Sequence, residues 1–186
     1  MLELAVLGLL HEAPMHGYEL RKRLHDTPGA FRALSCGTLY PTLRRLQRAG
    51  LIEEEPDAHG WGRRARRVYR ITPDGEFRFT ELVGDCGPQA CDDNAFGVHM
   101  VFFSRTPAEV RLRILEGRRR RVEERRDGLR SALARDDRFD RYTRELHRLR
   151  LDHSEREVRW LDEIIENERA EQDAAAREQE LQGHDR

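Results

Sequence analysis

Hydrophobic and polar positions along the first part of the chain follow a helical period. Residues 2–10 are apolar on nearly every side, which is typical of a short helix buried inside a small domain. The sequence HEAP at 11–14 interrupts this pattern. A second helix is expected over residues 17–25, with leucines on one face and three consecutive basic residues pointing away from them. Two short packed helices are therefore predicted at the start of the chain.

A third amphipathic helix, expected within residues 35–52, is the most informative segment. Its buried face is defined by leucines at helical spacing, Leu39, Leu43 and Leu46. Tyr40, Arg44 and Arg45 lie off that stripe and give the open face an aromatic ring and hydrogen-bond donors. A helix with an apolar back, an arginine-rich front and a polar start is what readout of the DNA major groove requires.

The ends of this third helix are marked by residues with special backbone preferences. Pro41 is compatible with a helix only near its start, where the missing N–H is not needed. Either Ser35 or Thr38 has a side chain suited to cap that start. Gly50 is suited to the left-handed conformation that ends a helix.

Two strands and a closing helix are predicted next. Residues 51–55 and 66–71 are rich in β-branched or aromatic side chains, and the arginine-bearing stretch 56–64 between them has the composition of a hairpin tip. Thr72 followed by Pro73 forms the start of a further helix, as its cap and first helical residue. Three helices, a β-hairpin and a closing helix, in that order, describe a winged helix-turn-helix domain.

Four blocks of this domain resemble the signature of PadR-type transcriptional regulators. They are HGYEL at 16–20, GTLYP at 37–41, GLI at 50–52 and VYRITPDG at 68–75, and together they cover roughly residues 1–82. The resemblance implies a dimeric DNA-binding regulator, most often a repressor, with a helical C-terminal dimerisation region. The fold class expected is thus mainly α with a small β-hairpin wing, followed by long C-terminal helices.

The residues expected to contact DNA come from the second helix, the third helix and the wing. Tyr18 and Tyr40 fit either the core or a DNA contact, and their polar ends near an arginine face suit the contact at least as well as the core. The candidate DNA-binding residues are Tyr18, Ser35, Thr38, Tyr40, Pro41, Arg44, Arg45, Arg63, Arg64 and Arg66. The third helix is expected to enter the major groove with its residues near bases or phosphates, and the arginines of the wing are expected to reach neighbouring backbone or the minor groove.

Beyond the winged domain the composition changes twice. Turn-forming residues predict a linker and junction segment over 83–106. The sequence TPAE at 106–109 is a capping box with proline at the first helical position, and it opens a helical dimerisation region over 107–170. Residues 171–186 are polar and are expected to form a disordered tail.

The dimerisation region is expected to form two long helices. In the first, a heptad frame that begins at Ala108 is apolar at six of its eight positions, and the arginines at 118–121 are expected on a solvated face. The second is ~45 Å long, too long for an 80-residue winged domain to cover its apolar face, so a homodimer is predicted. The predicted dimer residues are Leu115, Val122, Leu129, Tyr142, Leu146, Leu149, Val158, Trp160, Leu161, Ile164 and Ile165.

An effector site is the remaining hypothesis for the junction between the two regions. Phe96, Phe102, Phe103 and Trp160 are the aromatic residues expected there, and a cavity between them would suit an apolar or aromatic small molecule. Trp160 fits the dimer core equally well, and the sequence leaves both roles open.

Composition restricts the function further. The chain has 186 residues and a net charge of −1, divided into +3 over residues 1–80 and −4 over the remainder, so its basic surface is local. No apolar run approaches the ~20 residues of a membrane span, and the start lacks a basic signal sequence, so a cytoplasmic protein without membrane contact is expected.

The three cysteines have plain structural interpretations. Cys86 and Cys91 are interpreted as part of a linker in preference to a metal site. Cys36 is interpreted as a partly buried residue in preference to an oxidation switch.

Catalytic patterns are not found in the sequence. It has no nucleophile elbow, phosphate loop, paired-carboxylate arrangement or histidine metal motif, so neither an enzyme nor a cofactor nor a metal is predicted.

The function predicted is a dimeric, sequence-specific regulator of transcription that binds a palindromic operator in double-stranded DNA, represses it, and is released by a small-molecule effector. The alternative is a helical interaction protein that uses the winged domain to bind another protein.

Overall fold

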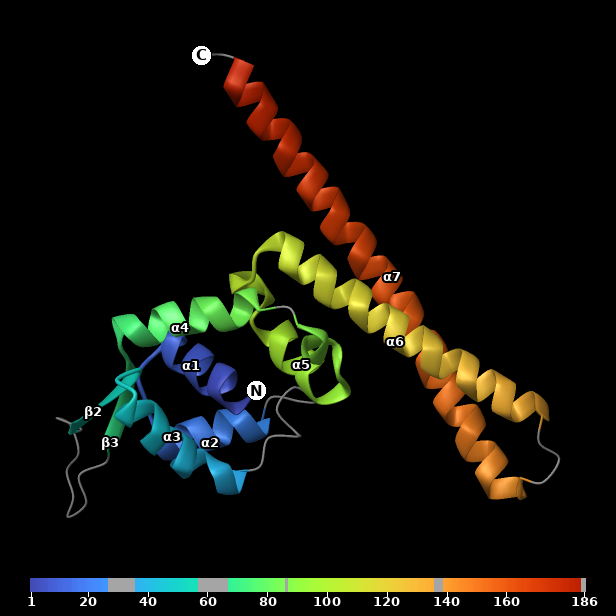
Figure 1. The fold of residues 1–186 in the computed structure, drawn as a ribbon, viewed down its shortest axis with the longest axis horizontal. Helices are drawn as coiled ribbons and strands as arrows, with labels where there is room; N and C mark the ends of the chain where they lie inside the picture. The colour runs from blue at the N-terminus through green and yellow to red at the C-terminus, as the bar shows by residue number, and fades with distance from the viewer. Residues whose placement is uncertain (27–35, 57–66, 86, 136–138, 185–186) are drawn as a thin grey trace. The chain divides into compact units, whose positions relative to one another are not determined.

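A computed structural model describes residues 1–26, 36–56, 67–85, 87–135 and 139–184. The chain forms two compact units, Met1–Pro107 and Ala108–Arg186. Helices make up most of both units, and a small antiparallel sheet lies in the first (Figure 1). The predicted fold class, mainly α with a β-hairpin wing and long C-terminal helices, is confirmed.

The first unit contains the predicted winged helix-turn-helix. In chain order it comprises α1 (Leu2–Glu12), β1 (Met15–His16), α2 (Gly17–Asp26), α3 (Leu39–Arg48), β2 (Ile52–Pro56), β3 (Arg67–Ile71), α4 (Pro73–Gly84) and α5 (Asp93–Val101). The strands pair in the order β1-β3-β2, with Tyr69 of β3 opposite Glu54 on one side and Met15 on the other. Strand β1 was not predicted, because a strand of two residues is too short to show an alternation of apolar and polar positions.

Helix α1 forms the centre of the core in this unit. Residues 4–10 are all buried, as the all-round apolar pattern predicts. Leucines from α2 and α3, Ile52 of β2 and Phe79 of α4 pack in the same cluster. The start of α4 is fixed as predicted, since the Thr72 hydroxyl oxygen accepts a hydrogen bond of 3.1 Å from the Gly75 N–H.

The segment expected to be a linker is folded and belongs to this core. After α4, a short 3-10 turn at Pro88–Cys91 leads into α5. Val98 of α5 and Phe102, which directly follows the helix, are buried in the same hydrophobic cluster as α1. The unit therefore extends to Pro107, about 25 residues beyond the boundary expected from the sequence. The turn-forming residues of this segment led to the prediction of a linker, although nine of its residues form the helix α5.

The second unit is a pair of long antiparallel helices. Helix α6 (Ala108–Arg135) and helix α7 (Arg141–His184) lie side by side (Figure 1). The apolar side chains buried in this unit are Val110, Ile114, Leu115, Val122, Val158, Leu161 and Ile165. Helix α7 continues to His184, whereas the sequence predicted a helix that ends near Arg169 and a disordered tail.

Ion pairs add to the apolar contact between the two helices. Arg111 of α6 is 2.7 Å from Glu168, and Arg118 is 2.6 Å from Glu157. Arg118 is buried, so the expectation of a fully solvated face at 118–121 is wrong for this residue. A buried guanidinium without its carboxylate would be strongly destabilising, and Glu157 on the facing helix supplies the partner.

Among the described residues, no helix combines the length and the apolar character needed to cross a membrane.

Candidate nucleic-acid interface

Helix α3 has the two faces that the sequence predicts. Its leucines, Leu39, Leu43 and Leu46, are fully buried against the core. Its predicted DNA-contacting residues are all exposed, namely Thr38, Tyr40, Pro41, Arg44 and Arg45. The buried stripe holds the helix on the domain and leaves a polar face with an aromatic ring and cationic groups toward solvent.

Both ends of α3 are defined by local backbone chemistry. Thr38 occupies the N-cap position, although its side chain makes no capping hydrogen bond to the helix, and Pro41 lies in the first turn as predicted. At the other end Gly50 has a φ of 72°, and the Leu51 N–H donates to the Leu46 carbonyl at 3.0 Å. This left-handed glycine cap directs the chain out of α3 and straight into the wing.

The two neighbouring arginines of α3 have different surroundings. The Arg45 guanidinium donates to a carboxylate oxygen of Glu3 in α1 at 2.7 Å. Arg44 is exposed, and within the described ranges its guanidinium has no ion-pair partner. Arg44 is thus the arginine of this pair whose charge is available to a ligand, while Arg45 ties α3 to α1.

Glu3 links three helices of this unit, and the sequence analysis did not predict this role. Its second oxygen accepts from the Arg78 guanidinium of α4 at 3.0 Å, so a single carboxylate joins α1, α3 and α4. Burial favours a raised pKa for Glu3, but the hydrogen bonds from Arg45 and Arg78 outweigh it and hold the pKa below its ordinary value. An acidic residue at the start of an otherwise apolar helix is unusual, but the sequence does not show which residues it contacts.

Tyr40 is partly exposed and also packs against its own domain. The residue is 49% exposed. Its ring also covers Gly17, where an added Cβ would lie 3.4 Å from Tyr40 Cε1 and 3.5 Å from a ring carbon of Tyr69. Burial, with a smaller contribution from Glu54, raises the pKa of the Tyr69 hydroxyl above its ordinary value. Gly17 of α2 therefore lies beside two tyrosines, one from α3 and one from the sheet.

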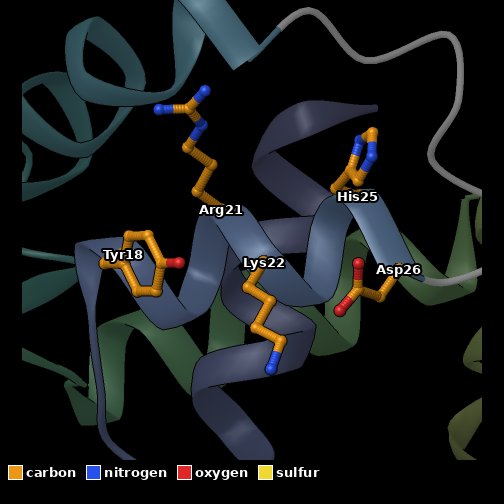
Figure 2. A pocket seen from close by; sticks show the side chains of 5 residues that line it. All are labelled: Tyr18, Arg21, Lys22, His25 and Asp26. Carbon is orange, nitrogen blue, oxygen red and sulfur yellow. The ribbon is translucent and has the colours of Figure 1, made fainter.

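Helix α2 adds a polar and largely basic outer surface. Tyr18 is 75% exposed there. Figure 2 shows its side chain with those of Arg21, Lys22, His25 and Asp26 around a hollow on the outer face of the helix. Exposed cationic and hydroxyl groups of this kind suit phosphate oxygens. Only Tyr18 of these five was among the predicted DNA-binding residues.

The base of the wing is charge-balanced across its two strands. Arg67 of β3 is 2.9 Å from Glu54 of β2, and Arg70 is 3.2 Å from Glu55. These acidic side chains are therefore neutralised where the wing begins. The remaining predicted DNA-binding residues, Ser35, Arg63, Arg64 and Arg66, lie outside the described residues.

The predicted dimer residues divide into two groups in the helical unit. Leu115, Val122, Val158, Leu161 and Ile165 are buried, and Leu129 and Ile164 are partly buried. The exposed members are Tyr142, Leu146, Leu149 and Trp160, all on α7. The first group contributes to the packing of α6 on α7, and the second presents an apolar face to solvent.

The aromatic residues predicted for an effector site belong to both units. Phe96 and Phe102 are buried in the first unit, where Phe102 makes an edge-to-face contact with Phe79 at a centroid distance of 5.5 Å. Phe103 is partly buried in the same unit, and Trp160 belongs to α7. Packing within the winged unit thus accounts for Phe96 and Phe102.

A winged helix-turn-helix with an exposed, arginine-bearing third helix defines a class of DNA-binding proteins. Comparisons with known proteins agree. A model of the transcriptional regulator PadR-like family matches residues 6–81. Transcriptional regulator Rv3488 of Mycobacterium tuberculosis is 44% identical over 79 residues, which are 40% of this chain and 68% of that protein.

Solved structures with similarity to the chain include two of Bacillus subtilis PadR. One is a complex with operator DNA, with a TM-score of 0.43 and 19% identity, which covers 90% of this chain and 98% of that one. Another is a complex with p-coumaric acid, with a TM-score of 0.41, 18% identity and the same coverage.

The chain belongs to the PadR-like family of transcriptional regulators. It is therefore a DNA-binding regulator of transcription and not an enzyme, and the resemblance seen in its four sequence blocks is confirmed.

Proposed function

We propose that this regulator is a homodimeric repressor that binds a palindromic operator and is released by a small-molecule effector. The observation that carries the proposal is the exposed face of α3, where Tyr40 and Arg44 lie opposite a fully buried leucine stripe. Two such helices related by a twofold axis would enter successive major grooves about 34–36 Å apart. The exposed apolar residues of α7 would supply the dimer contact.

Within each half-site the residues have different tasks. Thr38, Tyr40 and Arg44 face bases or nearby phosphates, and Pro41 sets the start of the helix among them. Arg45 positions α3 through Glu3. Tyr18 of α2 and the wing residues Arg63, Arg64 and Arg66 contact flanking phosphates or the minor groove. Base contacts of this kind discriminate by about 1–3 kcal/mol, whereas phosphate contacts carry no sequence information.

The experiment is a comparison of operator and random DNA, with DNA from upstream of the protein's own gene as the first operator candidate. Arg44→Ala is expected to weaken operator binding by about tenfold or more while random-DNA binding changes little. Arg63→Ala is expected to weaken both and to lower the slope of log affinity against log salt by about 0.9.

Arg148→Ala is the matched control, because Arg148 is an exposed arginine on α7 that pairs with Glu145 in its own helix. It is expected to bind both DNAs as the wild type does. Equal losses on operator and random DNA for Arg44→Ala would contradict direct readout by α3. A winged domain that binds only another protein would show no DNA affinity at all.

A further inference from the structure

The three arginines of α3 differ in what compensates their charge. Arg48 donates from Nε to the Arg44 carbonyl at 3.3 Å, within its own helix. Among the described residues, neither Arg44 nor Arg48 has a carboxylate within ion-pair distance. Arg45 is the exception, because its guanidinium lies 2.7 Å from a carboxylate oxygen of Glu3. Within the described chain, the exposed face of α3 thus has two uncompensated arginines and one compensated arginine.

Glu3 keeps its negative charge at physiological pH. Its side chain is only 17% exposed, whereas that of Arg45 is 54% exposed. Its other oxygen accepts from Arg78 of α4 at 3.0 Å, and Arg78 also donates to Glu81 at 3.1 Å. Burial acts to raise the pKa of Glu3, but the hydrogen bonds from both guanidinium groups outweigh it and hold the pKa below its ordinary value. The carboxylate is therefore ionised and lies between two cations.

The exposed guanidinium of Arg45 would have to leave this ion pair in order to bind a DNA phosphate. Phosphate contacts from Lys and Arg supply essentially all of a protein's affinity for random DNA, and each contact releases condensed counterions. An arginine that stays on a carboxylate releases none. Arg44 and Arg45 also point in directions about 100° apart around α3, so a groove that receives Arg44 does not require a contact from Arg45.

We propose that Glu3 determines specificity by keeping Arg45 away from the DNA backbone. Fewer phosphate contacts then contribute to sequence-independent binding, while Tyr40 and Arg44 remain available for bases. The effect is largest on random DNA, where no base contact fixes the register and the protein can shift until its cations meet phosphates. On an operator the base contacts fix the register, so a released Arg45 gains less. The inference rests on the proposed function, because it requires an operator that α3 reads.

Glu3→Gln tests the proposal in the full-length protein, because it keeps the shape of the side chain and one acceptor but removes the charge. The affinity for random DNA at low salt is expected to rise about fivefold. The slope of log affinity against log salt is expected to steepen by about 0.9 for each subunit in which Arg45 gains a phosphate. Operator affinity is expected to rise by less than about twofold, so the preference for operator over random DNA falls.

Two variants separate the release of Arg45 from a general change of charge. Glu81→Gln removes a carboxylate from the same Arg78 but leaves the pair of Glu3 and Arg45 in place, so its salt slope is expected to equal that of the wild type. The double variant of Glu3→Gln with Arg45→Gln has the net charge of the wild type. It is expected to return the random-DNA affinity and the slope to the wild-type values.

Arg45→Gln alone does not depend on how well a Glu3 variant folds. Since Arg45 contacts no phosphate while Glu3 holds it, this substitution is expected to leave the slope on random DNA unchanged. A loss of about 0.9 for each subunit would show that Arg45 already contacts the backbone, and it would overturn the proposal.

The remaining outcomes are also decisive. A slope for Glu3→Gln that is no steeper than that of Glu81→Gln would overturn the proposal. Weaker binding of Glu3→Gln to both DNAs with an unchanged slope would mean that Glu3 only supports the fold, and this too would overturn it. A wild-type protein that binds operator and random DNA equally would contradict the proposed function, while the slopes on random DNA would still show whether Glu3 restrains Arg45.

Discussion

The ring of Phe102 lies directly against Gly8 in the middle of α1. A Cβ added to Gly8 would lie 2.3 Å from both Cε1 and Cζ of that ring, a distance that no packed side chain tolerates. Phe102 in turn meets Phe79 of α4 edge to face. This contact joins the segment after α4 to the first helix of the domain, so the winged unit is completed by residues well beyond its closing helix.

Gly8→Ala is expected to destabilise the protein by about 1 kcal/mol. Overpacking of a buried site costs about 1–3 kcal/mol, and the better helix propensity of alanine recovers about 1 kcal/mol of this. Thermal or urea unfolding measures the effect. Gly84→Ala is the control, because nothing lies within 4 Å of its added Cβ, and it is expected to be neutral or slightly stabilising. A Gly8→Ala protein as stable as Gly84→Ala would show that Phe102 moves aside freely.

Truncation tests the extent of the winged unit. A chain that ends at Pro107 retains Val98 and Phe102 in the core, whereas a chain that ends at Val83 loses both. Burial of each such side chain contributes about 1.5–3 kcal/mol, a large share of a typical stability of 5–15 kcal/mol. The longer fragment is expected to unfold cooperatively, and the shorter one to melt at lower temperature and bind a hydrophobic dye. Equal stability of the two would place the domain boundary near residue 83.

The winged elements were readable from the sequence because local chemistry marks them. The leucine stripe, Pro41, Gly50 and the Thr72 cap each act within one turn of the residue that carries them, and the structure has these features where the pattern predicts. The position of α5 and the role of Glu3 were not readable. Glu3 meets Arg45 and Arg78 at separations of 42 and 75 residues, and such contacts leave no periodic pattern.

The Glu3 ion pairs are expected to make stability depend on pH in the acidic range. Because the pKa of Glu3 is lowered below 4.5 in the folded state, its contribution is fully present above pH 4.5 and is lost as the pH falls through the lowered pKa. Glu3→Gln is expected to lower the free energy of unfolding by about 1 kcal/mol at pH 7. The effect is small because solvent around the exposed arginine partners screens the ion pairs. Its unfolding temperature should approach that of the wild type at pH 3.

A matched substitution identifies the source of that effect. Glu81→Gln removes an exposed carboxylate that pairs with the same Arg78, and it is expected to change stability by less than about 0.5 kcal/mol at either pH. A Glu3→Gln deficit that stays constant between pH 7 and pH 3 would mean that packing, and not charge, accounts for the contribution of Glu3.

The sequence predicts which positions of the long helices are apolar better than it predicts what each apolar side chain contacts. The sequence indicates which residues of α7 are apolar but not which of them α6 covers, because both groups repeat at spacings of three and four residues. The structure separates them. Leu161 is fully buried, whereas its neighbour Trp160 is 40% exposed. Trp160 follows Leu149 by 11 residues, which is about three helical turns, so it lies on the same exposed face as Leu149.

Two adjacent substitutions therefore test the dimer face. Trp160→Arg places a charge on the exposed apolar face, so it is expected to weaken self-association by at least about tenfold and to reduce operator affinity, with little change in helix content. Leu161→Ala creates a cavity under α6 and is expected to cost about 2–5 kcal/mol of stability. Sedimentation equilibrium over a range of concentrations measures the first effect, and chemical unfolding measures the second. If Trp160→Arg associates as tightly as the wild type, another surface makes the dimer, and the exposed residues of α7 need a different partner.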